Sequence, residues 1–116
     1  MTDAPELAAV ADRLQAILEP YRGRLEASSI YGVPVLRRPG AKAHAWFAGV
    51  QVADRYVKFN FLPMHGHPEL LDGISPMLRK RKTGASVFRF ERIDEALFAE
   101  LEGVVARAYD IYAGEA

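Results

Sequence analysis

HAWFAGVQVADRYVKFNFLPM, residues 44–64, decides the fold because it predicts a β-hairpin at the centre of a small sheet. The second arm of this hairpin is the clearest strand in the chain, with apolar and polar side chains alternating at every second position. Its apolar face carries Val57, Phe59 and Phe61, and its other face carries Tyr56, Lys58 and Asn60. We expect the apolar face to point at the helices, because the reverse register would bury Lys58 and Asn60 without partners.

The first arm places a second row of residues on the solvent side. The same alternation predicts Ala45, Phe47 and Gly49 on the inner face and His44, Trp46 and Ala48 on the outer face. The whole outer face would then carry His44, Trp46, Tyr56, Lys58 and Asn60. This mixture of aromatic and polar side chains suits a protein partner or a small planar ligand. Two plainer interpretations stay open: a solvent-facing sheet without a ligand, or Trp46 covered by the segment 64–82.

Two amphipathic helices flank the strand region. The first begins at Asp3, a good N-cap, and ends at Pro20, and the second begins at Asp94 and ends at Gly114. Short strands are expected at 25–30, 35–36 and 86–91, and short helical turns at 69–72 and 76–80. The sequence therefore predicts an α+β fold in a single domain, 1–116. We expect a two-layer sandwich, in which the N- and C-terminal helices pack on one face of an antiparallel sheet of about five strands.

The composition excludes several classes of protein. The 116 residues contain no cysteine, which excludes a disulfide framework, a thiolate metal site and a cysteine nucleophile. Asp3 and Glu6 lie where a secretory signal has a basic flank, and no apolar run approaches ~20 residues. We therefore expect a cytoplasmic protein without a membrane segment.

The charges are unevenly distributed although the formal net charge is zero. The segment 77–92 has six cations and one anion, whereas the segment 93–116 has six anions and one cation. Zero net charge disfavours non-specific binding to nucleic acid or to a membrane. The asymmetry permits weak self-association of the chain into a homo-oligomer.

A run of four cations, Arg79, Lys80, Arg81 and Lys82, is the first candidate binding site in the basic segment. Together with the turn at 83–84 it could hold a phosphate, another small anionic ligand or an acidic protein partner. It is not a P-loop, because glycine, lysine and hydroxyl occur in the wrong order. The alternative is a solvated loop. Nucleic acid is a less favoured ligand, because its bases could stack on Trp46 and Tyr56 only if both rings share the exposed face of the sheet.

His65 and His67 form the only histidine cluster and are candidate metal ligands. A metal site needs at least a third ligand, for which Glu69 and Asp72 are the nearest candidates. The alternative is two solvated loop histidines, since helical HxxxH or HExxH spacing is absent.

Several motifs occur in the order in which a known family has them: YGVP (31–34), WFA (46–48), RYV (55–57) and LLDGISP (70–76), followed by Lys80, Arg81, a Thr-Gly pair and Phe88. Over nearly its whole length the chain resembles the YdhG-like domain of unknown function, which has a frataxin-like fold. A related member is described as a frataxin-like iron chaperone, so the resemblance also implies weak iron binding by acidic residues along the first helix and strand. Here that segment mixes carboxylates with Arg13, Arg22 and Arg24, and such a mixture holds a hard cation poorly.

No serine, histidine and carboxylate set and no pair of carboxylates has the context that catalysis needs. We therefore expect a non-enzymatic binding or adaptor domain without a cofactor, which acts through the outer sheet face and the basic run. A weak metal-handling protein of the frataxin type is the alternative.

Overall fold

The structure, a computed structural model, describes residues 4–30, 32–40, 42 and 45–114. Its helices are α1 (Ala4–Leu18), α2 (Pro63–Gly66), α3 (Pro76–Arg79) and α4 (Glu95–Gly114), with the 3-10 turns η1 (Glu19–Tyr21) and η2 (Pro68–Leu71). Its strands are β1 (Glu26–Ile30), β2 (Val33–Arg37), β3 (Trp46–Val52), β4 (Val57–Phe61), β5 (Lys82–Thr83) and β6 (Val87–Phe90). Among these residues, no helix is both long and apolar enough to cross a membrane.

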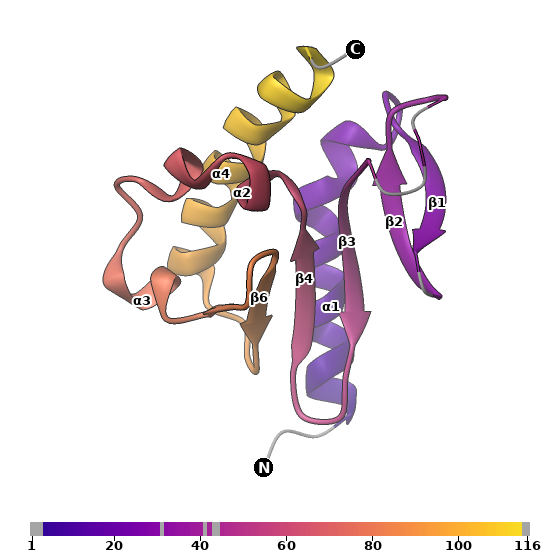
Figure 1. Cartoon of the computed structure of the whole chain (residues 1–116). Helices are drawn as coiled ribbons and strands as arrows, with labels where there is room; N and C mark the ends of the chain where they lie inside the picture. The colour runs from indigo at the N-terminus through magenta and orange to yellow at the C-terminus, as the bar shows by residue number, and fades with distance from the viewer. Residues whose placement is uncertain (1–3, 31, 41, 43–44, 115–116) are drawn as a thin grey trace.

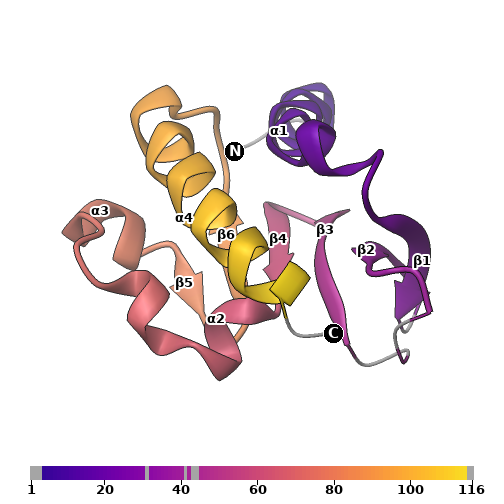
Figure 2. The ribbon, with the colours of Figure 1, turned by 90° about the horizontal axis from the view of Figure 1, so that it is seen from above.

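The strands form one antiparallel sheet in the order β1-β2-β3-β4-β6-β5. Figure 1 shows β1, β2, β3, β4 and β6 of this sheet. The two long helices, α1 and α4, lie on the same side of this sheet (Figure 2). This confirms the predicted α+β class and its two layers. The described residues form six strands where the sequence predicted about five, because Lys82 and Thr83 pair with Phe88 and Val87 across a tight turn.

The helices begin where their capping residues indicate. The Leu97 amide at the start of α4 donates to Asp94 Oδ1 at 3.2 Å, which confirms the predicted N-cap. The Leu78 amide of α3 donates to Ser75 Oγ at 3.2 Å in the same way. The predicted cap of α1, Asp3, lies outside the described residues.

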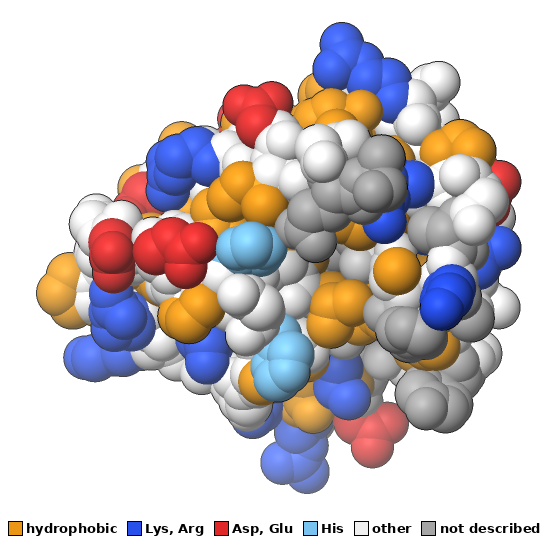
Figure 3. Space-filling view, turned by 45° about the horizontal axis from the view of Figure 1, so that its top comes forward, with side chains coloured by type: hydrophobic (Ala, Val, Ile, Leu, Met, Phe, Trp, Pro, Cys, Tyr) orange, Lys and Arg blue, Asp and Glu red, His pale blue; other side chains and the backbone are white. Residues whose placement is uncertain are grey.

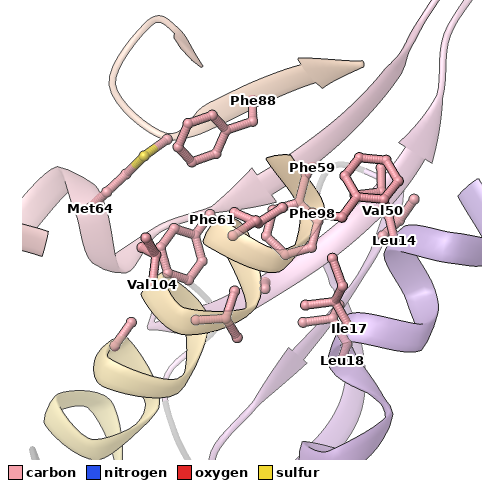
Figure 4. Packing of buried hydrophobic residues seen from close by; sticks show 14 of the residues in the cluster. Leu14, Ile17, Leu18, Val50, Phe59, Phe61, Met64, Phe88, Phe98 and Val104 are labelled. Carbon is pink, nitrogen blue, oxygen red and sulfur yellow. The ribbon is translucent and has the colours of Figure 1, made fainter. Parts of the chain in front are cut away.

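The apolar stripes of both helices pack on the inner face of the sheet and form one core (Figure 4). Val57, Phe59 and Phe61 of β4 are completely buried in it, as their alternation predicted. From β6, Phe90 packs edge-on against Phe98 of α4, with ring centroids 5.0 Å apart. The central hairpin therefore forms part of the sheet surface on which the helices pack.

The first arm of the hairpin differs from the prediction at Ala48 and Gly49. Ala48 is buried opposite Phe61 on the inner face, whereas Gly49 pairs with Asn60 on the outer face. The cause is a β-bulge: Leu36 of β2 pairs with Ala48 and Arg37 pairs with Trp46, so that Phe47 is an additional residue on β3. Phe47 is itself completely buried, and two consecutive residues therefore enter the core.

Candidate functional site

Lys58 and Asn60 lie on the outer face of β4 and Tyr56 directly precedes this strand, but Trp46 does not join them. In the hairpin, Lys58 pairs with Gln51, whereas Trp46 begins β3 at the opposite end. Tyr56 lies next to the connection between the strands, where its carbonyl accepts from the Ala53 amide at 2.9 Å. The structure thus separates the two aromatic residues that the sequence placed on one surface, and His44 lies outside the described residues.

Arg89 takes the place of Trp46 beside the polar residues of β4. It lies directly opposite Lys58 in the register of β4 and β6. Its guanidinium carbon lies 3.8 Å from the centre of the Tyr56 ring, in a cation–π contact. Lys58 and Arg89 therefore form a pair of cations on neighbouring strands, and the Tyr56 ring contacts the Arg89 guanidinium.

The basic run meets the same edge of the sheet. The Arg89 amide donates to the Arg81 carbonyl at 2.8 Å, which brings β6 alongside the start of β5. A hollow of about 250 Å³ opens here, and it is lined by Lys80, Arg81, Lys82, Thr83, Arg89 and Glu91. We call Lys58, Lys80, Arg81, Lys82 and Arg89 the basic face.

Arg79 is the one member of the predicted run that turns away. One of its guanidinium nitrogens donates to the Leu71 carbonyl at 2.8 Å and so ties α3 to η2. Lys82 remains beside the hollow while its Nζ donates to the Gly84 carbonyl at 2.6 Å.

Arg81 Nε is buried and has no hydrogen-bond partner among the described residues. Asn60 Nδ2, two residues after Lys58 on the same face of β4, is also buried without a hydrogen-bond partner among the described residues.

Charge compensation on the basic face is incomplete. Of the residues that line the hollow, Glu91 alone carries a carboxylate. The ion pairs within the described parts of the chain involve Arg13, Arg22, Arg37 and His67, and none includes a residue of the basic face. The face therefore presents several cations whose charge the rest of the described protein leaves unneutralised.

Trp46 lies in a separate pocket at one end of the sandwich. The pocket has a volume of about 320 Å³ and is lined by Arg38, Ala45, Trp46, Leu62, Pro63, His65, Gly66, His67 and Tyr112. Figure 3 looks onto this end of the molecule, where histidine side chains lie beside hydrophobic ones. The structure thus brings His65 and His67 to the same pocket as Trp46, in line with the alternative in which the segment 64–82 lies over Trp46. We call it the Trp46 pocket.

Metal ligation gains little support from these positions. His67 Nδ1 lies 3.2 Å from Glu69 Oε1, but the described residues contain no group of three histidine or carboxylate side chains that could hold a metal ion. Two of the carboxylates that the frataxin resemblance implies as iron ligands are in ion pairs with arginine: Glu19 with Arg22 at 2.9 Å, and Glu26 with Arg37 at 3.1 Å.

Arg89 is the main residue of this site that sequence analysis missed. The alternation in β6 already put it on the face opposite Phe88 and Phe90. Its role depends on the order of the strands, because only the pairing of β4 with β6 sets it against Lys58.

Comparisons with protein-family models, with curated proteins and with solved structures found no match to this chain. The relation to the YdhG-like domain stays a prediction from the sequence motifs.

Proposed function

We propose that this chain is a non-enzymatic binding domain whose basic face binds an acidic segment of a protein partner. The observation that carries the proposal is the position of Lys58 directly opposite Arg89. Like charges directly opposite each other on neighbouring strands destabilise a sheet. A carboxylate bound between the two cations would replace that repulsion with two attractive interactions.

The hollow beside this pair supports the same proposal. Lys80, Arg81 and Lys82 surround it together with Arg89, so a partner bound at the Lys58–Arg89 pair would also meet these cations. Hydrogen bonds between guanidinium groups and carboxylates are among the stronger ones in proteins, because both partners are charged.

A protein segment fits this face better than a nucleic acid does. Stacking of bases requires open aromatic rings, but the Tyr56 ring is already covered on one side by Arg89, and Trp46 lies at the other end of the hairpin. Carboxylates are also close, since Glu91 and Asp94 line a neighbouring hollow together with Arg81. A long polyanion would meet these carboxylates, whereas a short acidic segment can be confined to the basic face.

We also propose that the chain belongs to the YdhG-like domains, with a frataxin-like fold, and that it acts in the cytoplasm. The order of elements, a helix, a run of antiparallel strands and a long C-terminal helix, agrees with what the resemblance implies. The cysteine-free composition is compatible with a reducing compartment.

Binding of a labelled oligoglutamate peptide, followed by fluorescence anisotropy, tests the function. We expect the double variant Lys58→Gln/Arg89→Gln to weaken binding at least about tenfold, because it removes the charge pair. The double variant Arg22→Gln/Lys42→Gln is the control, since it removes the same net charge outside the basic face. We expect it to change the affinity less than about twofold. Equal losses in both variants, or tighter binding of oligothymidylate than of oligoglutamate, would contradict the proposal.

A further inference from the structure

The Trp46 pocket has the features of a small-molecule site that is independent of the basic face. It forms where the segment after β2, the start of β3, α2 and the end of α4 meet. Its volume of about 320 Å³ lies at the lower end of the range for ligand sites, about 300–1,000 Å³, which is enough for one or two rings. The residues that line the pocket indicate which chemical class of ligand would fit.

Arg38 supplies the charge of this pocket. The side chain is half-buried, and its guanidinium carbon lies 4.8 Å from the centre of the Tyr112 ring. One guanidinium nitrogen donates to the Tyr112 carbonyl at 3.1 Å. No carboxylate pairs with Arg38 within the described ranges, so its positive charge is held in place but not neutralised.

Tyr112 fixes this arrangement from the other side. Its hydroxyl accepts a hydrogen bond from the Arg38 amide at 2.9 Å and donates to the Ala45 carbonyl. The tyrosine is buried, and its ring packs 5.2 Å from Phe47 of the core. The backbone on both sides of the pocket is therefore tied to α4, which makes the pocket a pre-formed site.

The remaining lining favours a flat apolar ligand. Trp46 is half-buried, and Leu62 and Pro63 add apolar walls beside it. A ring placed on the Trp46 indole would gain both apolar contact and an offset-stacked or edge-to-face interaction. His65 also belongs to the lining, and its imidazole ring has a nitrogen that can donate a hydrogen bond to an anion.

We propose that the Trp46 pocket binds a small planar aromatic carboxylate, with the ring against Trp46 and the carboxylate on the Arg38 guanidinium. A guanidinium recognises a carboxylate through two parallel hydrogen bonds, so the planar fork of Arg38 matters as well as its charge. The proposal does not depend on the basic face, because the two sites share no residue.

The protein reports on this pocket directly, because Trp46 is the only tryptophan of the chain. Benzoate is the probe, benzamide keeps the ring without the charge, and cyclohexanecarboxylate keeps the charge without the flat ring. We expect benzoate to change the tryptophan fluorescence with a Kd of about 1 mM or tighter. Both analogues should bind at least about fivefold more weakly than benzoate, benzamide because it lacks the charge and cyclohexanecarboxylate because it lacks the flat ring.

Variants then assign the contacts by calorimetry. We expect Arg38→Gln to weaken benzoate at least about tenfold while leaving benzamide unchanged, which also shows that the pocket is still formed. Arg38→Lys should recover part of the loss, because it restores the charge without the fork. Lys58→Gln, on the basic face, should leave benzoate binding unchanged while it weakens oligoglutamate.

Three results would overturn the proposal. They are a benzoate Kd weaker than about 10 mM, equal affinities for benzoate and benzamide, and an Arg38→Gln variant that loses benzamide as well as benzoate. None of these results would contradict the acidic-partner proposal, which is tested with oligoglutamate and with substitutions on the basic face.

Discussion

Lys58 and Arg89 are the residues on which the proposed function depends, and their position has a cost for the free protein. They face each other across β4 and β6, and neither has an ion-pair partner in the described part of the chain. The contact of Arg89 with Tyr56 fixes the guanidinium without reducing its charge. The two charges therefore lower the stability of the free protein, whereas they favour the binding of an acidic partner.

The first prediction at the residue scale follows from that opposition. Lys58→Gln should raise the free energy of unfolding at low salt by about 0.2–1 kcal/mol, because it removes the repulsion from Arg89. The gain should shrink as salt rises, since ions screen the wild-type repulsion. Urea denaturation at low and high salt measures both effects, with Lys42→Gln as the control. A gain that does not change with salt would show that charge is not its cause.

A second prediction concerns Gly49, on the outer face of β3. A Cβ atom at this position would lie 2.1 Å from the Pro34 carbonyl oxygen, closer than any side-chain atom can come to backbone. Gly49→Ala should therefore lower the free energy of unfolding by about 1–3 kcal/mol, as overpacking does. Gly23→Ala is the matched control, because a Cβ atom at Gly23 meets nothing within 4 Å. Similar stabilities of the two variants would contradict the close approach of β2 and β3.

At the scale of elements, α1 and α4 are joined at the surface by Arg13 and Glu95. Arg13 Nε donates to Glu95 Oε2 at 2.9 Å, and a second guanidinium nitrogen donates to Oε1. The hydrogen bond from Arg13 lowers the pKa of Glu95 from its ordinary value. The ionised form of Glu95 is therefore favoured more in the folded than in the unfolded protein.

This pair predicts a pH dependence of stability. A carboxylate with a lowered pKa contributes stability above the pKa of the unfolded state, and that contribution disappears as pH falls through the lower folded pKa. The difference in urea midpoint between wild type and Glu95→Gln should thus be present at neutral pH and vanish in acid. Glu6→Gln removes an exposed carboxylate of α1 and is the control. A difference that persists in acid would mean that the Arg13 contact is not its source.

Alternation alone was enough to predict the second arm of the hairpin but not the first. In β4 every second residue enters the core, so Val57, Phe59 and Phe61 identify the buried face without knowledge of any neighbour. In β3 the bulge puts Phe47 and Ala48 on the same side. A bulge is set by the pairing with β2, which the sequence of β3 does not contain.

At the scale of the whole molecule, the structure separates Trp46 from Tyr56, Lys58 and Asn60, because sites form where distant elements meet. Trp46 and Tyr56 are ten positions apart on one hairpin, yet they occupy opposite ends of it. Trp46 instead meets Arg38 and Tyr112, and Lys58 meets Arg89. These neighbours depend on the order of the strands and on the position of the end of α4. Local sequence patterns predict neither of these two features.

Two carboxylates of the acidic segment 93–116 have partners within the fold. Of the carboxylates in the acidic segment, Glu95 pairs with Arg13, and Glu100 accepts hydrogen bonds from the amide and hydroxyl of Ser75. These carboxylates are thus engaged within the protein, which weakens the case for self-association through α4. The basic face has no ion-pair partner among the described residues, and this favours an acidic partner from outside the chain.

The affinity for oligoglutamate as a function of salt tests the central claim most directly. If the basic face binds acidic segments through its unneutralised cations, the wild-type Kd should rise steeply as ionic strength passes about 0.15 M, where the screening length is about 8 Å. Lys58→Gln/Arg89→Gln should flatten that dependence, and Arg22→Gln/Lys42→Gln should keep it. A wild-type Kd that does not change with salt, or the same slope in both double variants, would contradict the account.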